Sequence, residues 1–138
     1  MTKKVKNAKF EFTGETKVVF GVTLNRIRAV TTIAAIGVAA GDVGGWIERE
    51  ENLSAYGNAW GSGDARVSGD AQVYGDARVS GNARVSGDAR VYGNAWVSGD
   101  ARVYGDAQVY GNAWVSGDAR VQTVNIAATR TDGYTFLV

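Results

Sequence analysis

Apolar residues return at a fixed spacing over the second half of the chain. From Ala65 to Val121 an alanine and a valine stand two positions apart, and this pair recurs at every sixth position. Such alternation predicts an extended strand in which Ala and Val share one face. The residues between and after them point to the other face and are polar or aromatic. Each unit therefore predicts one short strand with a single buried face.

A glycine followed by Asp or Asn separates each strand from the next. Both residue types tolerate left-handed backbone angles, and Asx side chains bond nearby backbone, so the pair is typical of a turn. Each repeat unit then reads as a four-residue strand and a two-residue corner. The glycines stand at 57, 63, 69, 75, 81, 87, 93, 99, 105, 111 and 117.

The outward residues follow a second, longer period, because the same outward letters return at every third unit. This period predicts three strands per coil, with equivalent residues of successive coils about 4.8 Å apart. The result is a triangular solenoid with a Val/Ala interior. One outward column holds Arg66, Arg84, Arg102 and Arg120; a second holds Trp60, Arg78, Trp96 and Trp114; a third holds Tyr56, Tyr74, Tyr92 and Tyr110.

These repeats resemble the hexapeptide-repeat, left-handed parallel β-helix family. The likeness rests on the valines at every sixth position, the alanines two positions before them and the Gly-Asp/Asn corners. It implies an all-β fold, a single-stranded parallel β-helix, and the left hand of the coil is known only from the likeness. The repeat frame extends back to residue 45, with Gly45 in the glycine column and Ile47 and Leu53 in the alanine column, and fades after Val121.

The amino-terminal segment has a different pattern. Residues 10–30 alternate in polarity and predict a β-hairpin that turns at Thr13-Gly14-Glu15 and caps the first coil, since solenoid ends need a cover. The lysines at 3, 4, 6 and 9 are expected to form a solvated tail. The chain thus divides into a cap (1–44), a β-helix (45–121) and a short C-terminal β segment (122–138).

Residues 19–60 resemble the opening of uncharacterised phage and prophage proteins, in which a similar cap precedes a β-helix. The run from Gly41 to Ile47, GDVGGWI, is the most distinctive part. Residues 124–138 look like the start of the β-rich tail that such proteins often carry, either naturally short or cut. The amino end does not read as a signal peptide and the apolar run at 34–40 is too short to span a bilayer, so we expect a cytoplasmic protein. If the likeness means that a phage encodes it, this is the cytoplasm of the host cell.

Composition removes several kinds of chemistry. The 138 residues include no Cys and no His, which excludes a disulfide framework, a thiolate metal site and the commonest general base. The formal charge of +1 argues against duplex nucleic acid or an acidic membrane as partner. We expect no cofactor and no metal.

The residues of the repeat argue against catalysis, a calcium site and an ice-binding face. Hexapeptide acyltransferases commonly use a histidine and a loop that interrupts the coils, and this chain has neither between 57 and 121. The corner aspartates alternate with asparagine, and so we interpret them as turn residues and not as calcium ligands. The outward columns lack the threonine array of an ice-binding face. We expect a protein that is not an enzyme.

The three columns are the candidate binding faces, and two interpretations of each stay open. Ladders of like side chains stabilise a coil, as cross-strand pairs do in a sheet. Exposed Trp, Tyr and Arg are also the preferred anchors of interfaces. The arginine column, stacked with incomplete counter-charge, makes a modest case for a small anionic ligand.

The leading functional hypothesis is a non-catalytic binding or scaffold protein of phage type. Its partner would be another protein or a second copy of itself, and its role could be to counter a host defence factor by binding a protein or sequestering a nucleotide signal. The alternative is a structural protein that assembles end to end or into symmetric oligomers.

Overall fold

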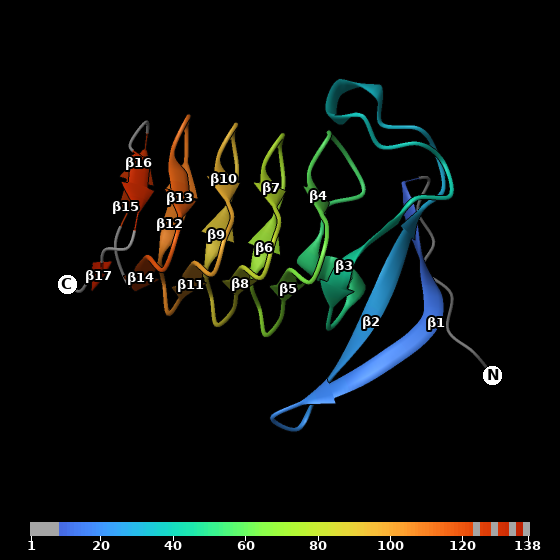
Figure 1. Cartoon of the computed structure of the whole chain (residues 1–138), viewed down its shortest axis with the longest axis horizontal. Coiled ribbons are helices and arrows are strands. Elements are labelled where there is room, and N and C mark those ends of the chain that lie inside the picture. The colour runs from blue at the N-terminus through green and yellow to red at the C-terminus, as the bar shows by residue number, and fades with distance from the viewer. Residues whose placement is uncertain (1–8, 123–124, 128–129, 133–134, 137–138) are drawn as a thin grey trace.

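The computed structural model describes residues 9–122, 125–127, 130–132 and 135–136. These residues form an all-β structure that contains two short 3-10 turns and no α-helix. Coils stack along the long axis of the molecule, and a long hairpin covers the amino-terminal end (Figure 1). In the described part of the chain, no helix has the length and apolar character needed to cross a membrane.

Three sheets form the sides of the solenoid, and we name each after the outward residues that mark it. The Arg sheet has the strand order β1-β2-β3-β5-β8-β11-β14-β17, the Trp sheet β16-β13-β10-β7-β4, and the Tyr sheet β15-β12-β9-β6. The Arg sheet contains β1 (Phe10–Val19), β2 (Val22–Ala29), β3 (Val43–Ile47), β5 (Arg66–Val67), β8 (Arg84–Val85), β11 (Arg102–Tyr104), β14 (Arg120–Gln122) and β17 (Thr135–Phe136). The Trp sheet contains β4 (Trp60–Gly61), β7 (Arg78–Val79), β10 (Trp96–Val97), β13 (Trp114–Ser116) and β16 (Arg130–Asp132). The Tyr sheet contains β6 (Gln72–Val73), β9 (Arg90–Val91), β12 (Gln108–Tyr110) and β15 (Asn125–Ala127).

Successive coils pair in parallel, and each strand pairs with the strand that lies three units further along the chain. Arg66 lies opposite Arg84, and Gln72 lies opposite Arg90, each in the next coil. The three-strand coil predicted from the second period is therefore confirmed. The left hand stays a prediction from the likeness.

The interior consists of the repeated alanines and valines. Every Ala from 59 to 119 and every Val from 67 to 121 in the repeat frame is buried. Ala and Val fill the interior without polar atoms, and their burial removes apolar surface from water at about 25 cal/mol per Å². The same cluster continues through Ile47 of the first coil to Phe10 and Ile27 of the cap.

The corners require glycine. At the corner after β5, Gly69 has φ +63°, and the Ala71 amide donates to the Ser68 carbonyl oxygen, which closes a tight turn. A Cβ on Gly69 would lie 3.1 Å from the Gly87 nitrogen of the next coil. Backbone angle and close stacking together explain the unbroken glycine column.

The first coil has two extra residues, which corrects the predicted frame. Ile47 pairs with Val67 where the regular spacing would give Ala65, and Leu53 bridges to Val73 where it would give Ala71. Ile47 and Leu53 therefore occupy the valine column, and not the alanine column expected for them. The regular spacing returns at Trp60, which pairs with Arg78.

The amino-terminal hairpin is confirmed, but its predicted turn is wrong. β1 continues through Thr13-Gly14-Glu15, where the pairing with β2 shifts register between Phe12 and Thr16. The chain reverses at Phe20 and Gly21, which have φ values of 50° and 78°. Gly14 lies within this irregular part of β1 and has a φ of +96°, which glycine adopts readily. β2 pairs with β3, and this places the hairpin over the first coil as an extension of the Arg sheet.

Lys9 is buried, with 4% of its surface exposed, and does not belong to a solvated tail. Its ammonium group donates to the Ala59 carbonyl oxygen at 2.7 Å. Burial lowers the pKa of Lys9 to about 8. The other three lysines of that cluster lie outside the described residues.

One more coil follows Val121, where the repeat pattern fades. β15, β16 and β17 pair in parallel with β12, β13 and β14. Gln108 lies opposite Asn125, Trp114 opposite Arg130 and Arg120 opposite Thr135. In a regular coil the partner lies 18 positions further along the chain. Asn125, Arg130 and Thr135 come one, two and three positions before that place. This coil is therefore shorter than the others, so the repeat frame does not detect it.

Candidate functional site

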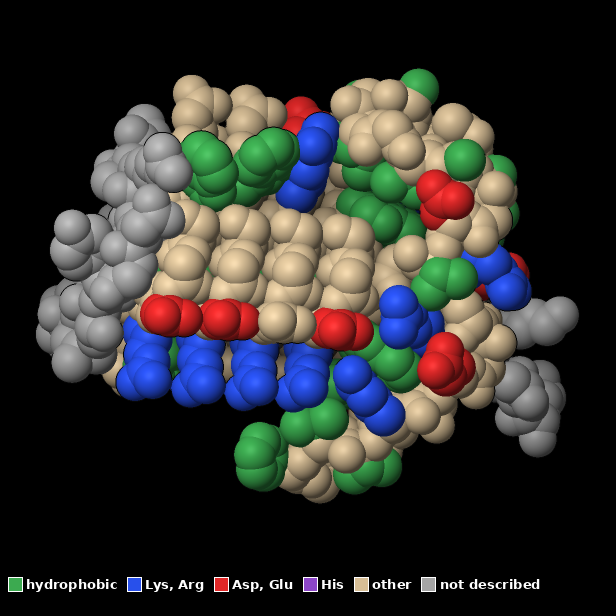
Figure 2. All heavy atoms as spheres, in the orientation of Figure 1, with side chains coloured by type: hydrophobic (Ala, Val, Ile, Leu, Met, Phe, Trp, Pro, Cys, Tyr) green, Lys and Arg blue, Asp and Glu red, His purple; other side chains and the backbone are tan. Residues whose placement is uncertain are grey.

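The arginine and tryptophan columns become straight rows along the solenoid (Figure 2). Parallel pairing in register forces equivalent side chains of successive coils to lie beside one another. The structure therefore brings together Arg66, Arg84, Arg102 and Arg120 on the Arg sheet, and Trp60, Arg78, Trp96 and Trp114 on the Trp sheet.

Trp60 and Trp96 share a column but not an environment. Trp60 is 4% exposed and belongs to the core, whereas Trp96 is 40% exposed. The Cβ position of Gly44, in the cap, lies 2.7 Å from an atom of the Trp60 ring. The expectation that Trp60 is part of an open face is therefore wrong, because the cap lies against it.

Arg78 connects the column to the cap loop. Its guanidinium carbon lies 5.0 Å from the centre of a Trp96 ring, a cation–π contact, and its Nη2 donates to the Ala35 carbonyl oxygen at 3.5 Å. Ala35 lies in η1 (Ala34–Ile36), the 3-10 turn of the loop between β2 and β3. The cap therefore helps to orient the arginine of this column.

A groove of about 230 Å³ lies where the cap loop meets the Trp sheet. Its apolar walls come from the loop and the indoles, and its polar groups are two serines and a guanidinium. The lining residues are Ile36, Val38, Trp60, Ser62, Arg78, Ser80 and Trp96. We call this groove, with Trp114 beside it, the Trp/Arg surface.

Trp114 extends the surface away from the cap. The rings of Trp96 and Trp114 meet edge to face, with centroids 5.8 Å apart and planes at 84°. The Trp114 indole nitrogen donates to the Ser98 hydroxyl at 3.4 Å. Edge-to-face packing fixes the orientation of both rings.

The arginine row runs beside a row of mostly acidic corner residues (Figure 2). Burial lowers the pKa of Arg84, and the neighbouring charges of Arg66 and Arg102 lower it further. The carboxylate of Asp100 raises the pKa of Arg84 in part. Residues of both rows line a hollow of about 380 Å³, namely Asn82, Arg84, Asp100, Arg102, Asp118 and Arg120.

Three tyrosines form a stack on the Tyr sheet. Tyr74 and Tyr92 lie 4.8 Å apart between centroids with planes at 5°, and Tyr92 and Tyr110 lie 5.2 Å apart with planes at 8°. Desolvation and the neighbouring Tyr92 raise the pKa of Tyr74. Tyr56 is 84% exposed and does not join the stack, contrary to the predicted column.

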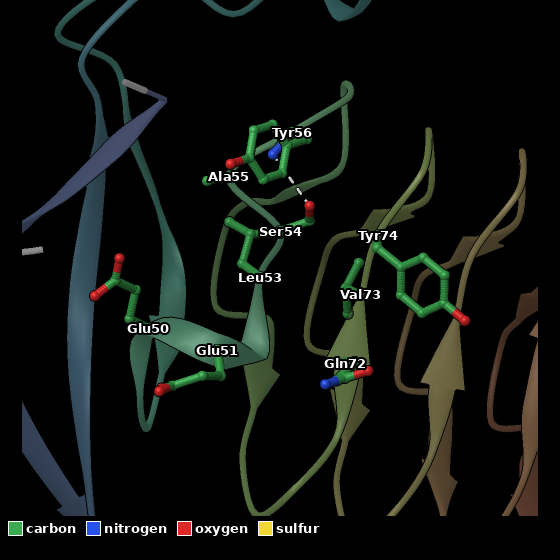
Figure 3. Close-up of a pocket in the computed structure, with 9 residues that line it drawn as sticks. All are labelled: Glu50, Glu51, Leu53, Ser54, Ala55, Tyr56, Gln72, Val73 and Tyr74. Carbon is green, nitrogen blue, oxygen red and sulfur yellow. Dashed lines mark hydrogen bonds between the residues drawn. The ribbon is translucent and has the colours of Figure 1, made fainter. Parts of the chain in front are cut away.

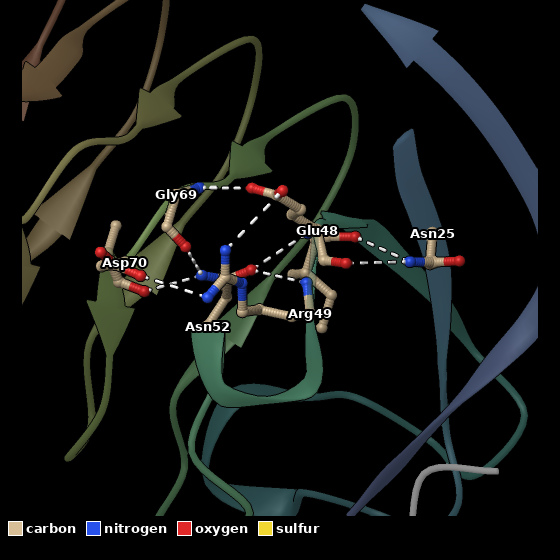
Figure 4. Close-up of polar contacts among 8 residues, drawn as sticks. Asn25, Glu48, Arg49, Asn52, Gly69 and Asp70 are labelled. Carbon is tan, nitrogen blue, oxygen red and sulfur yellow. Dashed lines mark hydrogen bonds and ion pairs between the residues drawn. The ribbon is translucent and has the colours of Figure 1, made fainter. Parts of the chain in front are cut away.

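The repeat pattern does not predict a polar cluster around the buried Asn52 at the start of the solenoid (Figure 4). The Asn52 amide nitrogen donates to the carbonyl oxygens of Gly69 and Ala71, and its amide oxygen accepts from the backbone amides of Glu48 and Arg49. The Asn52 side chain thereby pairs the carbonyl oxygens of Gly69 and Ala71 and the Arg49 amide. It is a second acceptor for the Glu48 amide, which also donates to the Val67 carbonyl oxygen. In the sequence Asn52 stands in the Asx column of the repeat frame, but Glu51 and not a glycine precedes it.

The solenoid pattern also matches a known type of repeat. The model of the YdcK beta solenoid repeat matches residues 62–75, 71–87, 83–99, 95–111 and 107–122. The protein is a β-helix repeat protein. A comparison with curated proteins found no match.

The repeat match covers residues 62–122, and it leaves out the cap, the first coil with Asn52 and the loop that borders the Trp/Arg surface. In this β-helix repeat protein the coils act as a rigid support, because every coil is bonded to the next through its backbone. The side chains that the support presents are aromatic rings and guanidinium groups. Such groups bind by stacking, by cation–π contact and by hydrogen bonds to anions.

Proposed function

We propose that this β-helix repeat protein is a rigid, non-catalytic binding module and that the Trp/Arg surface is its recognition site. The observation that carries the proposal is the position of Trp96, which is exposed although Arg78 on one side and Trp114 on the other hold it. An exposed but fixed indole loses little conformational entropy on binding. Trp and Arg are also enriched at binding hot spots.

The groove beside Trp96 suggests the chemistry of the partner. Ile36 and Val38 offer apolar walls, and the Arg78 guanidinium has more donors than the single hydrogen bond to Ala35 uses. A protein segment with an apolar side chain next to a carboxylate would satisfy both features. The hollow beside the arginine row would suit a small anion, which makes it the second candidate region.

The likeness of residues 19–60 to phage and prophage proteins suggests a biological setting. A rigid phage-encoded binding module could act against a host defence factor, either by covering a protein or by sequestering a nucleotide signal. The Trp/Arg surface fits the first action and the arginine row fits the second. Both actions require binding without catalysis.

The test is affinity capture from a bacterial host lysate, with mass spectrometry of proteins and small molecules in the eluate. The wild type is compared with Trp96→Ser and with Arg90→Gln, an exposed position on the Tyr sheet. We expect a partner that is retained by wild type and Arg90→Gln and lost with Trp96→Ser. A folded Trp96→Ser protein that keeps every partner would contradict the proposed surface.

End-to-end assembly is the second candidate function. Among the described strands, β15, β16 and β17 each stand last in their sheets, and backbone groups on such strands can pair with another chain. Light scattering over a wide concentration range separates the two functions. Growth of mass with concentration supports assembly, whereas one constant mass supports the binding module.

A further inference from the structure

The two extra residues of the first coil lie directly beside the tyrosine stack. The Ser54 amide donates to the Val73 carbonyl oxygen, just as the Tyr74 amide donates to Val91. Ser54 therefore occupies the place of a tyrosine in the first coil. The Asn58 amide donates to the Gly75 carbonyl oxygen, which restores the frame. Ala55 and Tyr56 are thus the inserted residues.

The insertion ends the stack at Tyr74. Tyr92 has a tyrosine ring on each side, whereas Tyr74 has a ring contact with Tyr92 alone in the described part of the structure. Tyr56 points away from Tyr74 in Figure 3, and its amide donates to the Ser54 hydroxyl at 3.0 Å. A place for one ring, at the 4.8 Å spacing of the stack, is therefore left beside Tyr74.

That place opens into a groove of about 590 Å³. Its apolar part includes Leu53 and Val73, and its charged side chains are those of Glu50 and Glu51 (Figure 3). Ser54, Ala55, Tyr56, Gln72 and Tyr74 complete the lining. Among the described residues that line the groove, the charged side chains are acidic.

We propose that this groove binds a planar aromatic cation, which continues the tyrosine stack by lying against Tyr74. The ring of the ligand would take the position that a fourth tyrosine would occupy in a regular coil. Its positive charge would be attracted by Glu51, which lines the same groove, and Tyr56 would border it on the side of the first coil. This site is separate from the Trp/Arg surface and does not depend on the proposed function.

The first test titrates the whole protein with N-methylquinolinium by NMR. Tyr74→Leu removes the stacking ring, and Tyr110→Leu is the matched control at the far end of the stack. We expect saturable binding that weakens by about 3–10-fold in Tyr74→Leu, the size of an aromatic pair, and is unchanged in Tyr110→Leu. No saturable binding, or equal losses in both variants, would overturn the proposal.

The second test measures whether the negative charge of the groove contributes to quinolinium binding. Glu51→Gln removes one charge from an exposed position, and we expect binding to weaken by about 2–5-fold at low salt. Naphthalene-2-sulfonate, a planar anion, should bind more weakly than the quinolinium. Tighter binding of the anion would contradict the assigned ligand class.

A deletion variant gives the sharpest test. Removing Ser54 and Ala55 joins Leu53 to Tyr56 and gives the first coil the same length as the regular coils, so that Tyr56 takes the place next to Tyr74. We expect this protein to fold with an extended stack and to lose quinolinium binding, because its own ring fills the site. Retained binding in the folded variant would show that the ligand lies elsewhere.

Discussion

The ammonium group of Lys9 donates a hydrogen bond to the carbonyl oxygen of Ala59, 50 residues further along the chain, and does so from a buried position. The contact ties the start of the hairpin strand to the first coil. A buried ammonium group is costly because it loses hydration, which is why its pKa falls to about 8.

This shift predicts that stability rises with pH in the alkaline range. The unfolded chain binds a proton at Lys9 up to about pH 10.5, whereas the folded chain releases it above about pH 8. Because the unfolded state holds more protons in this window, the free energy of unfolding increases with pH, by about 1–2 kcal/mol from about pH 8 to about pH 9.5. Urea unfolding at several pH values measures it.

Lys9→Met is the control for this dependence. The variant should lack most of the rise, and the difference from wild type isolates Lys9 from Lys17, whose pKa is also lowered. Parallel curves for the two proteins would show that Lys9 titrates as it does in water.

A corner glycine should tolerate alanine poorly. At Gly93, φ is +68° and an added Cβ would lie 2.8 Å from the Gly111 nitrogen. Gly37, with φ +71° and open space around it, is the matched control for backbone strain alone. We expect Gly37→Ala to cost about 1 kcal/mol and Gly93→Ala to cost at least about 1 kcal/mol more, measured by chemical denaturation. Equal losses of stability in the two variants would mean that neighbouring coils can move apart at Gly93 and accommodate the added Cβ without a further loss of stability.

Asn52 should contribute far more to stability than an exposed corner asparagine. Asn52→Ala removes the partner of two carbonyl oxygens and of the Arg49 amide, whereas the Glu48 amide keeps its bond to Val67. The change should lower the free energy of unfolding by about 2–4 kcal/mol. The side chain of Asn94 is exposed and donates to Asn112 at 3.4 Å, so Asn94→Ala should change the free energy of unfolding by less than about 0.5 kcal/mol. Similar losses in thermal or urea unfolding would contradict the structural role of Asn52.

Arg78 and Trp96 should be energetically coupled. A double-mutant cycle with Arg78→Met and Trp96→Leu is expected to give a coupling of about 0.5–1 kcal/mol in unfolding experiments. A control cycle that replaces Arg78→Met with Arg84→Met, on the Arg sheet, should give additive effects on stability. Additivity in the first cycle would mean that the guanidinium does not rest on the indole in solution.

The repeat made the solenoid predictable because the same physical requirement recurs in every coil. Val97 and Ala95 are buried for the same reason as their equivalents above and below, and Gly93 turns the corner between strands in the same way each time. One coil therefore determines the next. The hairpin lacked this redundancy, and Gly14 resembled a turn residue as closely as Gly21 did.

The candidate binding surfaces could be predicted only in part, because identical residues occupy different surroundings in different coils. Residues 56–60 and 92–96 both read YGNAW. In the second copy Tyr92 is stacked and Trp96 is exposed, whereas in the first Tyr56 is displaced and Trp60 is buried. The cap and the two inserted residues make this difference, and both act through contacts distant in sequence.

The constant size of the regular coils makes the length of this protein adjustable. Removing residues 81–98 would delete one coil and still join Ser80 to a glycine, so every corner and strand would keep its place. Arg78 would then lie beside Trp114, and the cap would keep its contacts with Trp60. The distance between the two ends of the molecule can thus change in steps of one coil, through an in-frame deletion or duplication, without any new packing.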